Sequence, residues 1–230
     1  MKISKFGLIL VFCPVLIWLI FTYPLVGNFN SSIYGNYFGD WASSISLLYD
    51  FRSGVRPLLW TDLFSPLTFI FKLVASWGVH PVFVYNFCVF FSFLLSFWGA
   101  YFFAHVLKFR KILSFLFAVL ITIAPIRLWY AFEWPKHAQW GFILFYLGFL
   151  FLFSRQRNSK QGGLAGLFFG LVLAENYYHG VILFFFTVAL LVIDFFYNSR
   201  WKRCRKYLLE ISIFPLSAVA FSLPSLYFFL

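Results

Sequence analysis

Asp40 is the carboxylate in this sequence with the clearest chemical possibilities. It follows Gly39 and stands close to Tyr37 and Trp41. We expect a carboxylate beside aromatic rings to be partly desolvated, which increases its affinity for a proton. Such a carboxylate is suited to act as a general base that takes a proton from a hydroxyl group. Asp before a helical pattern also commonly caps the helix. The two roles are compatible, because each needs the carboxylate held at the start of a helix.

A second group of reactive side chains lies within residues 127–140. It places Arg127, Glu133, Lys136 and His137 among aromatic rings. An aromatic belt with snorkelling cations at a membrane surface explains the rings and the two cations, but it does not readily explain Glu133 and His137. The alternative is that Arg127 and Lys136 hold the phosphate of a lipid-linked substrate, with a hydrogen bond donated by His137.

The third group is the polar break that contains Glu175, Tyr178 and His179. Ionisable groups at membrane depth are costly and usually face a cavity or a partner, so we expect this group to face the same pocket as the other two. A solvated turn is the alternative. The sequence has no phosphate-binding glycine loop, serine nucleophile elbow or zinc-binding helix motif.

The composition identifies the class of protein that must position these groups. The chain has 230 residues, of which 63% are hydrophobic, 26% aromatic and 11% charged, with a mean hydropathy of +0.87. These values are typical of a polytopic membrane protein, whose partner is the lipid bilayer. The net charge of +11 comes from short basic clusters between apolar runs, so it predicts membrane orientation and no nucleic-acid partner. Three cysteines form neither a disulfide framework nor a metal-ligand pattern.

Alternating apolar runs and basic clusters predict an all-α bundle with about seven spans. Lys2 and Lys5 keep the N-terminus in the cytoplasm under the positive-inside rule, which places residues 28–80 in the first extracytoplasmic loop. The protein is therefore expected to be a multi-pass protein of the inner (plasma) membrane. The predicted spans cover about residues 6–25, 81–107, 112–130, 138–153, 162–176, 180–198 and 211–230.

Three further features complete the predicted architecture. Apolar residues at helical spacing predict interfacial helices within residues 40–76 of the first outer loop. Gly162, Gly166 and Gly170 form a small-residue stripe, which lets another helix approach closely. The chain ends on an apolar run at Leu230 without a polar tail, so a truncated or split reading frame is expected.

The order of these features resembles the polytopic bacterial glycosyltransferases of the GT-C fold, over what corresponds to their N-terminal half. A basic first span leads to Gly39-Asp40 in a long outer loop, and later segments follow in a similar order. These segments are Trp60-Thr61-Asp62-Leu63-Phe64-Ser65-Pro66-Leu67, Ala124-Pro125-Ile126-Arg127, His137-Ala138-Gln139-Trp140 and Asn176-Tyr177-Tyr178-His179-Gly180.

The resemblance implies a polyprenyl-phosphate sugar donor and an acidic base in the first outer loop, a role that falls on Asp40. Many relatives carry a second acidic residue directly after the first, where this chain has Trp41, so no cofactor is predicted and a divalent metal is left open. The leading hypothesis is an inverting transfer to an extracytoplasmic acceptor, in which Arg127 or Lys136 stabilises the departing phosphate. The alternatives are a non-enzymatic carrier or binding subunit for lipid-linked saccharides, or an inactive fragment of such an enzyme.

Overall fold

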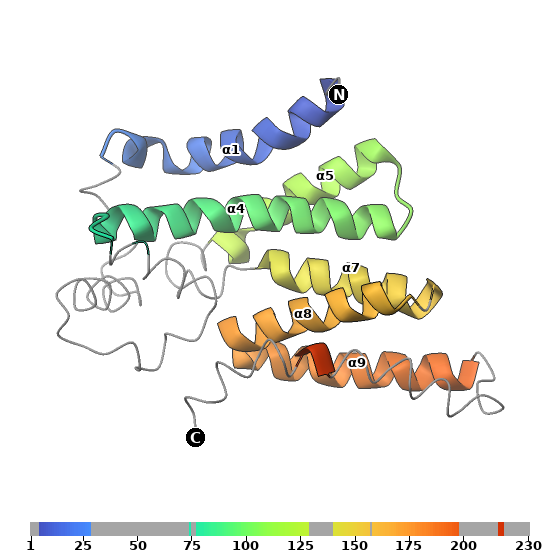
Figure 1. The fold of residues 1–230 in the computed structure, drawn as a ribbon. Helices are drawn as coiled ribbons and strands as arrows, with labels where there is room; N and C mark the ends of the chain where they lie inside the picture. The colour runs from blue at the N-terminus through green and yellow to red at the C-terminus, as the bar shows by residue number, and fades with distance from the viewer. Residues whose placement is uncertain are drawn as a thin grey trace.

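The computed structural model describes residues 5–28, 74, 77–128, 140–156, 158–197 and 216–218. Helices and short turns account for these residues, and no strand occurs among them, so the predicted all-α class is confirmed for this part of the chain. The longer helices are α1 (Lys5–Val26), α4 (Pro81–Val106), α5 (Lys111–Thr122), α7 (Trp140–Gln156), α8 (Ser159–Glu175) and α9 (Tyr177–Tyr197) (Figure 1). The helices predicted within residues 40–76, and nearly all of the span predicted at 211–230, lie outside the described residues.

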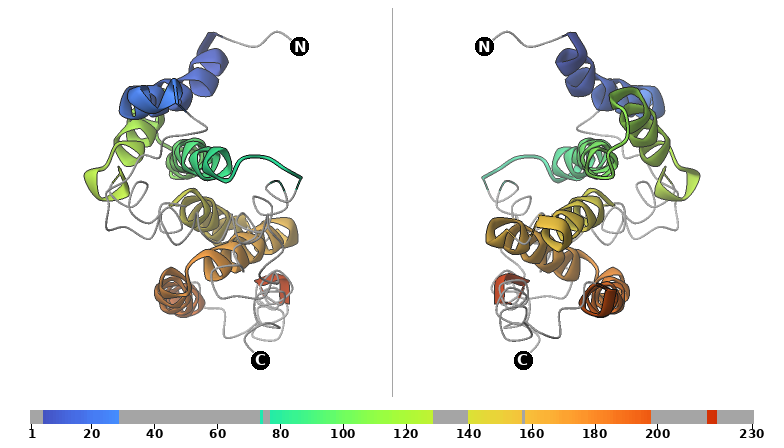
Figure 2. Two further views of the ribbon diagram at one scale, coloured as in Figure 1. Left: turned by 90° about the vertical axis from the view of Figure 1, so that its left-hand side faces the viewer. Right: turned by 90° about the vertical axis from the view of Figure 1, so that its right-hand side faces the viewer.

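Five of these helices follow one another in a row. Figures 1 and 2 show α1, α4, α7, α8 and α9 in this order, with α5 beside α4 and α1. Helix α4 contacts α1, α5 and α7, and α8 contacts both α7 and α9. Because α4 packs on three neighbours, it is the helix that joins the N-terminal part of the bundle to the rest.

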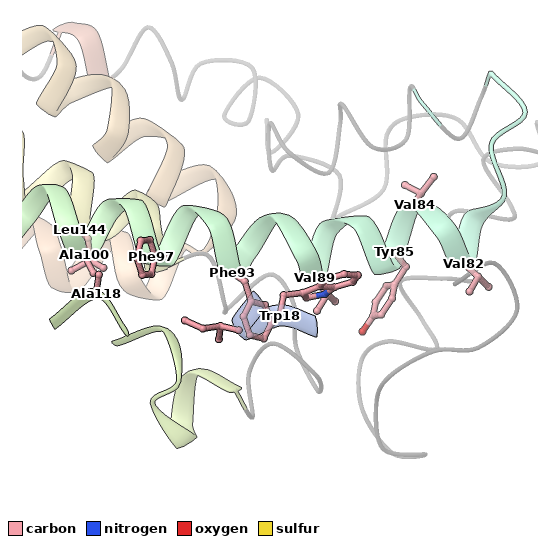
Figure 3. Packing of buried hydrophobic residues seen from close by; sticks show 11 residues of the cluster. Trp18, Val82, Val84, Tyr85, Val89, Phe93, Phe97, Ala100, Ala118 and Leu144 are labelled. Carbon is pink, nitrogen blue, oxygen red and sulfur yellow. The ribbon is translucent and has the colours of Figure 1, made fainter. Parts of the chain in front are cut away.

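Aromatic and aliphatic side chains of α1, α4 and α5 form one core. The Trp18 indole lies 4.8 Å from the Phe90 ring, and the Phe97 ring lies 5.9 Å from that of Phe115, both pairs in edge-to-face geometry. Figure 3 shows Trp18 of α1 beside Val89 and Phe93 of α4. Aromatic pairs at these separations stabilise a packed interface beyond the area that they bury.

Two glycines allow the backbones of α4 and α7 to come into close contact. A Cβ atom built on Gly141 would meet the Leu95 backbone carbonyl and would lie 2.6 Å from Leu95 Cβ. A Cβ on Gly99 would lie 2.7 Å from the Gly141 oxygen. The backbones therefore touch at a point that no larger residue would permit. The stripe of Gly162, Gly166 and Gly170 on α8 is also buried.

The third predicted span, at 112–130, is not one continuous helix. Helix α5 ends at Thr122, and a short helical turn follows at 125–128. Pro125 has no N–H group to donate to the Ile121 carbonyl, and it disfavours helical geometry in Ala124. The Ala124 N–H group bonds to Ile121 O instead, at 3.4 Å. The prediction missed this break because apolar residues continue across it.

The polar turn predicted at 175–180 is much shorter than expected. Helix α9 begins at Tyr177, and only Asn176 separates it from α8. The Asn176 side-chain oxygen accepts a hydrogen bond of 3.1 Å from the Tyr178 N–H group, which caps α9. An Asn cap provides a partner for one unsatisfied N–H group, so a single residue is enough to start the new helix.

Two described helices are long and apolar enough to cross a membrane, Phe6–Tyr23 and Pro81–Val106. Three shorter apolar helices cover Lys111–Thr122, Trp140–Gln156 and Tyr178–Asp194. Many large apolar side chains of α1, α5 and α9 are exposed, among them Phe12, Ile112 and Phe185. An outward apolar surface of this kind suits association with lipid.

Candidate functional site

Arg127 is the fully buried charged side chain of the described bundle. It lies on the short turn at 125–128, directly after the break in helix geometry before Pro125, and its exposed fraction is 0%. From the sequence, we expect this arginine at the membrane surface beside other polar groups. The side chain instead packs into the interface with α4, which is a contact that sequence spacing alone does not reveal.

The guanidinium of Arg127 is held from three directions. Its Nη2 donates to Ser92 Oγ at 2.7 Å, its Nη1 donates to the Thr122 carbonyl at 3.4 Å, and its Cζ lies 3.8 Å from the centre of the Phe93 ring. The Thr122 carbonyl belongs to the last turn of α5, where the helix break leaves acceptors without their usual N–H partners. The break therefore helps to create the site.

Ser92 is oriented to accept from the arginine. Its hydroxyl donates to the Val89 carbonyl at 2.7 Å, so its lone pairs are directed away from the α4 backbone. One turn further along the same face of α4, Ser96 is also completely buried, and its hydroxyl has no hydrogen-bond partner among the described residues. Two hydroxyl groups therefore interrupt an otherwise apolar face.

The charge of Arg127 is not neutralised within the described part of the chain. Its Nε has no hydrogen-bond partner there, and no described carboxylate pairs with it. Arginine stays protonated in proteins, so burial cannot be relieved by losing the charge. A hydroxyl, a carbonyl and an aromatic face offset only part of the cost of burying a cation, which is several kcal/mol. The arrangement suits the binding of an anion.

Tyr178 and His179 lie in the first turn of α9. The Tyr178 side chain is 61% exposed, and His179 is partly buried. Figure 1 shows the α8–α9 junction and the turn at 125–128 towards the same end of the bundle. The described hydrogen bonds of Arg127 are all with α4 and the end of α5, so neither Tyr178 nor His179 is among its described hydrogen-bond partners.

The other predicted site residues lie outside the described residues. These are Asp40, Glu133, Lys136 and His137. Their roles stay predictions. Arg127 is the member of the group at 127–140 whose geometry is described.

The chain matches no protein-family model, no curated protein and no solved structure. The order of the sequence motifs and the geometry around Arg127 are therefore the observations that bear on function.

Two further polar contacts, which the sequence did not predict, join α7 and α9. The Tyr146 hydroxyl is hydrogen-bonded to Thr187 Oγ1, and Ser154 Oγ lies 3.5 Å from Asp194 Oδ1. The two contacts are about two helical turns apart on each helix, so they lie on facing sides. The sequence signal for these contacts was a pair of polar residues about two turns apart in each apolar run, Tyr146 and Ser154 in α7 and Thr187 and Asp194 in α9. Since the partners lie about 40 residues apart, the sequence did not reveal which pairs would form.

Proposed function

We propose that this chain is a polytopic membrane glycosyltransferase that moves a sugar from a polyprenyl-phosphate donor to an extracytoplasmic acceptor. The main support is that Arg127 is fully enclosed while its Nε has no hydrogen-bond partner among the described residues. A phosphate oxygen is a strong acceptor for this group and supplies the negative charge that the site lacks. Asp40 is the proposed general base, which takes the proton of the acceptor hydroxyl as the sugar leaves the phosphate with inversion.

Arg127 is suited to the leaving group in particular. Negative charge builds up on the phosphate as the bond to the sugar breaks, and a fixed cation in an apolar site stabilises this charge strongly. Ser92 and Phe93 already hold the guanidinium in place, so little side-chain freedom is lost when the phosphate binds. Because Arg127 is enclosed, the covering side chains must move before a phosphate can reach Nε.

The proposed topology has seven spans, with the N-terminus in the cytoplasm of the inner membrane. In support, the turn between α4 and α5 and the link between α7 and α8 lie at the same end of the bundle (Figure 1). This end carries Lys108, Arg110, Lys111, Arg155 and Lys160. Clustered cations favour the cytoplasmic side.

Labelling with a membrane-impermeant thiol reagent tests this topology in intact cells. Single cysteines introduced at Asn30 and Glu133 are expected to react, whereas one at Ser159 is expected to react only after the cells are permeabilised. The reason is that Ser159 lies at the basic end of the bundle, directly before Lys160. Reaction at Ser159 in sealed cells would overturn the orientation.

Replacement of Arg127 tests the proposed function. Arg127→Gln is expected to lower release of polyprenyl phosphate from a sugar-loaded donor by about 10- to 100-fold, because it removes a charge-assisted hydrogen bond to the departing phosphate. The measurement uses membranes that contain the full chain and a radiolabelled donor. Arg155→Gln is the matched control, since Arg155 also donates to a backbone carbonyl, Val106 O at 2.9 Å, but at the C-terminal end of α4, away from Ser92 and Phe93 in its middle. Equal losses in both variants would remove Arg127 from the site.

The stability of Arg127→Met separates an anion site from a structural ion pair. If the charge awaits a phosphate, replacing it with an apolar side chain leaves stability unchanged or raises it. If a carboxylate of the chain, such as that of Glu133, already neutralises the charge of Arg127, replacing the arginine leaves that carboxylate buried without a partner. The free energy of unfolding is then expected to fall by about 3–5 kcal/mol. The free energy of unfolding in detergent micelles distinguishes these outcomes. The second outcome contradicts the proposed role of Arg127.

The rival function is a carrier or binding subunit for lipid-linked saccharides. It is favoured by the same enclosed arginine, because binding an anionic head group needs no general base. A carrier and an enzyme both need Arg127, whereas only the enzyme needs Asp40.

A further inference from the structure

Helix α5 has two different faces, and the outward face continues directly from a basic turn. Ser114, Ala118 and Thr122 are completely buried. Ile112, Leu116 and Leu120 lie on the opposite face, each about one helical turn from the next. Their exposed fractions are 70%, 49% and 65%. Residues four apart lie above one another on a helix, so these three leucine and isoleucine side chains form an apolar stripe. We call it the α5 stripe.

Three exposed cations stand at the beginning of the α5 stripe. Lys108 and Arg110 lie in the turn between α4 and α5, Lys111 is the first residue of α5, and all three are exposed. The two described acidic residues do not lie beside them: Glu175 ends α8 at the other end of the bundle, and Asp194 is buried next to Ser154. Within the described residues, these cations have no carboxylate partner.

The basic turn has a defined backbone conformation. The N–H groups of Leu107, Lys108 and Phe109 donate to carbonyls in the last turn of α4, at 3.0, 2.9 and 3.1 Å. Ser114 N–H donates to Arg110 O at 2.9 Å, which joins the turn to α5. The positions of the three cations relative to the α5 stripe are therefore set by the fold.

We propose that this turn and the α5 stripe bind an anionic phospholipid of the leaflet in which α5 begins. The phosphate head group contacts Lys108, Arg110 and Lys111, and an acyl chain lies along Ile112, Leu116 and Leu120. Helix α5 has 12 residues, which at 1.5 Å per residue is about 18 Å, and one leaflet contributes about 15 Å of hydrocarbon. The apolar stripe thus matches the length of one acyl layer, and the cations lie where the head groups are.

The partner is a lipid rather than a soluble phosphate because the cations and the exposed apolar stripe adjoin. A soluble anion would use only the charges, whereas a lipid uses both surfaces. The proposal does not rest on sugar transfer, so either can fail while the other holds.

Photocrosslinking tests this site on the full chain in nanodiscs of phosphatidylcholine and phosphatidylglycerol. A phosphatidylglycerol probe with a photoreactive group near the head group is expected to label residues 108–116 in preference to a matched phosphatidylcholine probe. Lys108→Gln/Arg110→Gln/Lys111→Gln is expected to reduce this preference by about fivefold or more, because each cation near an anionic surface contributes a factor of that size. The charge-conserving Lys108→Arg/Arg110→Lys/Lys111→Arg is expected to retain it.

A second triple variant controls for the general loss of positive charge. Lys202→Gln/Arg203→Gln/Arg205→Gln removes the same charge from a different basic cluster and is expected to leave labelling of 108–116 unchanged. An equal reduction by both triple variants would overturn the proposal, as would equal labelling by the two lipid probes. Full competition by inorganic pyrophosphate against the lipid probe would also overturn it, because the site would then recognise a soluble anion.

Discussion

Replacement of Asp40 by asparagine is expected to lower sugar transfer by about 10²–10⁴-fold, which is the contribution typical of general acid–base catalysis. The asparagine amide cannot take the proton of the acceptor hydroxyl. Asparagine is nevertheless a helix cap comparable to aspartate, so a purely structural Asp40 would tolerate the change with a loss of only a few tenths of a kcal/mol. The measurement is release of polyprenyl phosphate in membranes that contain the variant, with folding checked by thermal unfolding.

Two other carboxylates of the same predicted loop are the matched controls. Asp50→Asn and Asp62→Asn each remove one negative charge, and we expect both to retain near-normal transfer. Near-normal turnover in Asp40→Asn, or equal losses in all three variants, would leave Asp40 as a helix cap. Glu133 would then be the next candidate for the base. The carrier function is favoured by two observations together: Asp40→Asn still binds the donor, and the unmodified chain shows no measurable sugar transfer.

Gly141→Ala is expected to destabilise the bundle by about 3 kcal/mol, at the upper end of what overpacking usually costs. The new methyl group would meet the Leu95 carbonyl and Leu95 Cβ, where the backbones of α4 and α7 are already in contact. Relief requires a shift of a whole helix rather than of a side chain. The measurement is the free energy of unfolding in detergent micelles.

Gly163→Ala is the control for Gly141→Ala. Gly163 is inside α8, and a Cβ atom there would meet nothing within 4 Å. Alanine is favoured over glycine in a helix by about 1 kcal/mol, so this variant is expected to be unchanged or more stable. A matching loss in both variants would show that the contact with Leu95 is not the cause.

Apolar run length was the part of the fold that could be read directly from the sequence. An apolar helix can be identified from its own sequence, without knowing which helix it packs against. The thickness of the bilayer and the rise of a helix set its length, and polar residues mark its ends. The apolar run at 81–107 coincides with helix α4 (Pro81–Val106), and the run at 162–176 lies close to helix α8 (Ser159–Glu175). The break after Thr122 was missed, although Pro125 was a visible local signal for it.

The sequence also indicated that the residues at 127–140 were unusual, since cations, a carboxylate and a histidine are costly near lipid. It did not indicate the direction of Arg127. That direction depends on Ser92 and Phe93, which lie about 35 residues earlier on α4. Serine and phenylalanine are common in membrane helices, so nothing local marked these two as partners of an arginine.

Composition and local pattern by themselves determined that the described part of the chain forms apolar helices, approximately where most of these begin and end, and which polar groups need an explanation. Tertiary structure alone decided that Gly99 and Gly141 meet and that Arg127 is enclosed against α4. The physical reason is that helix formation depends on neighbours within about four residues, whereas helix pairing depends on side chains far apart in the chain. The same apolar helix surfaces can be buried by many different arrangements of the helices. Close backbone contacts and buried hydrogen bonds distinguish the observed arrangement from the others.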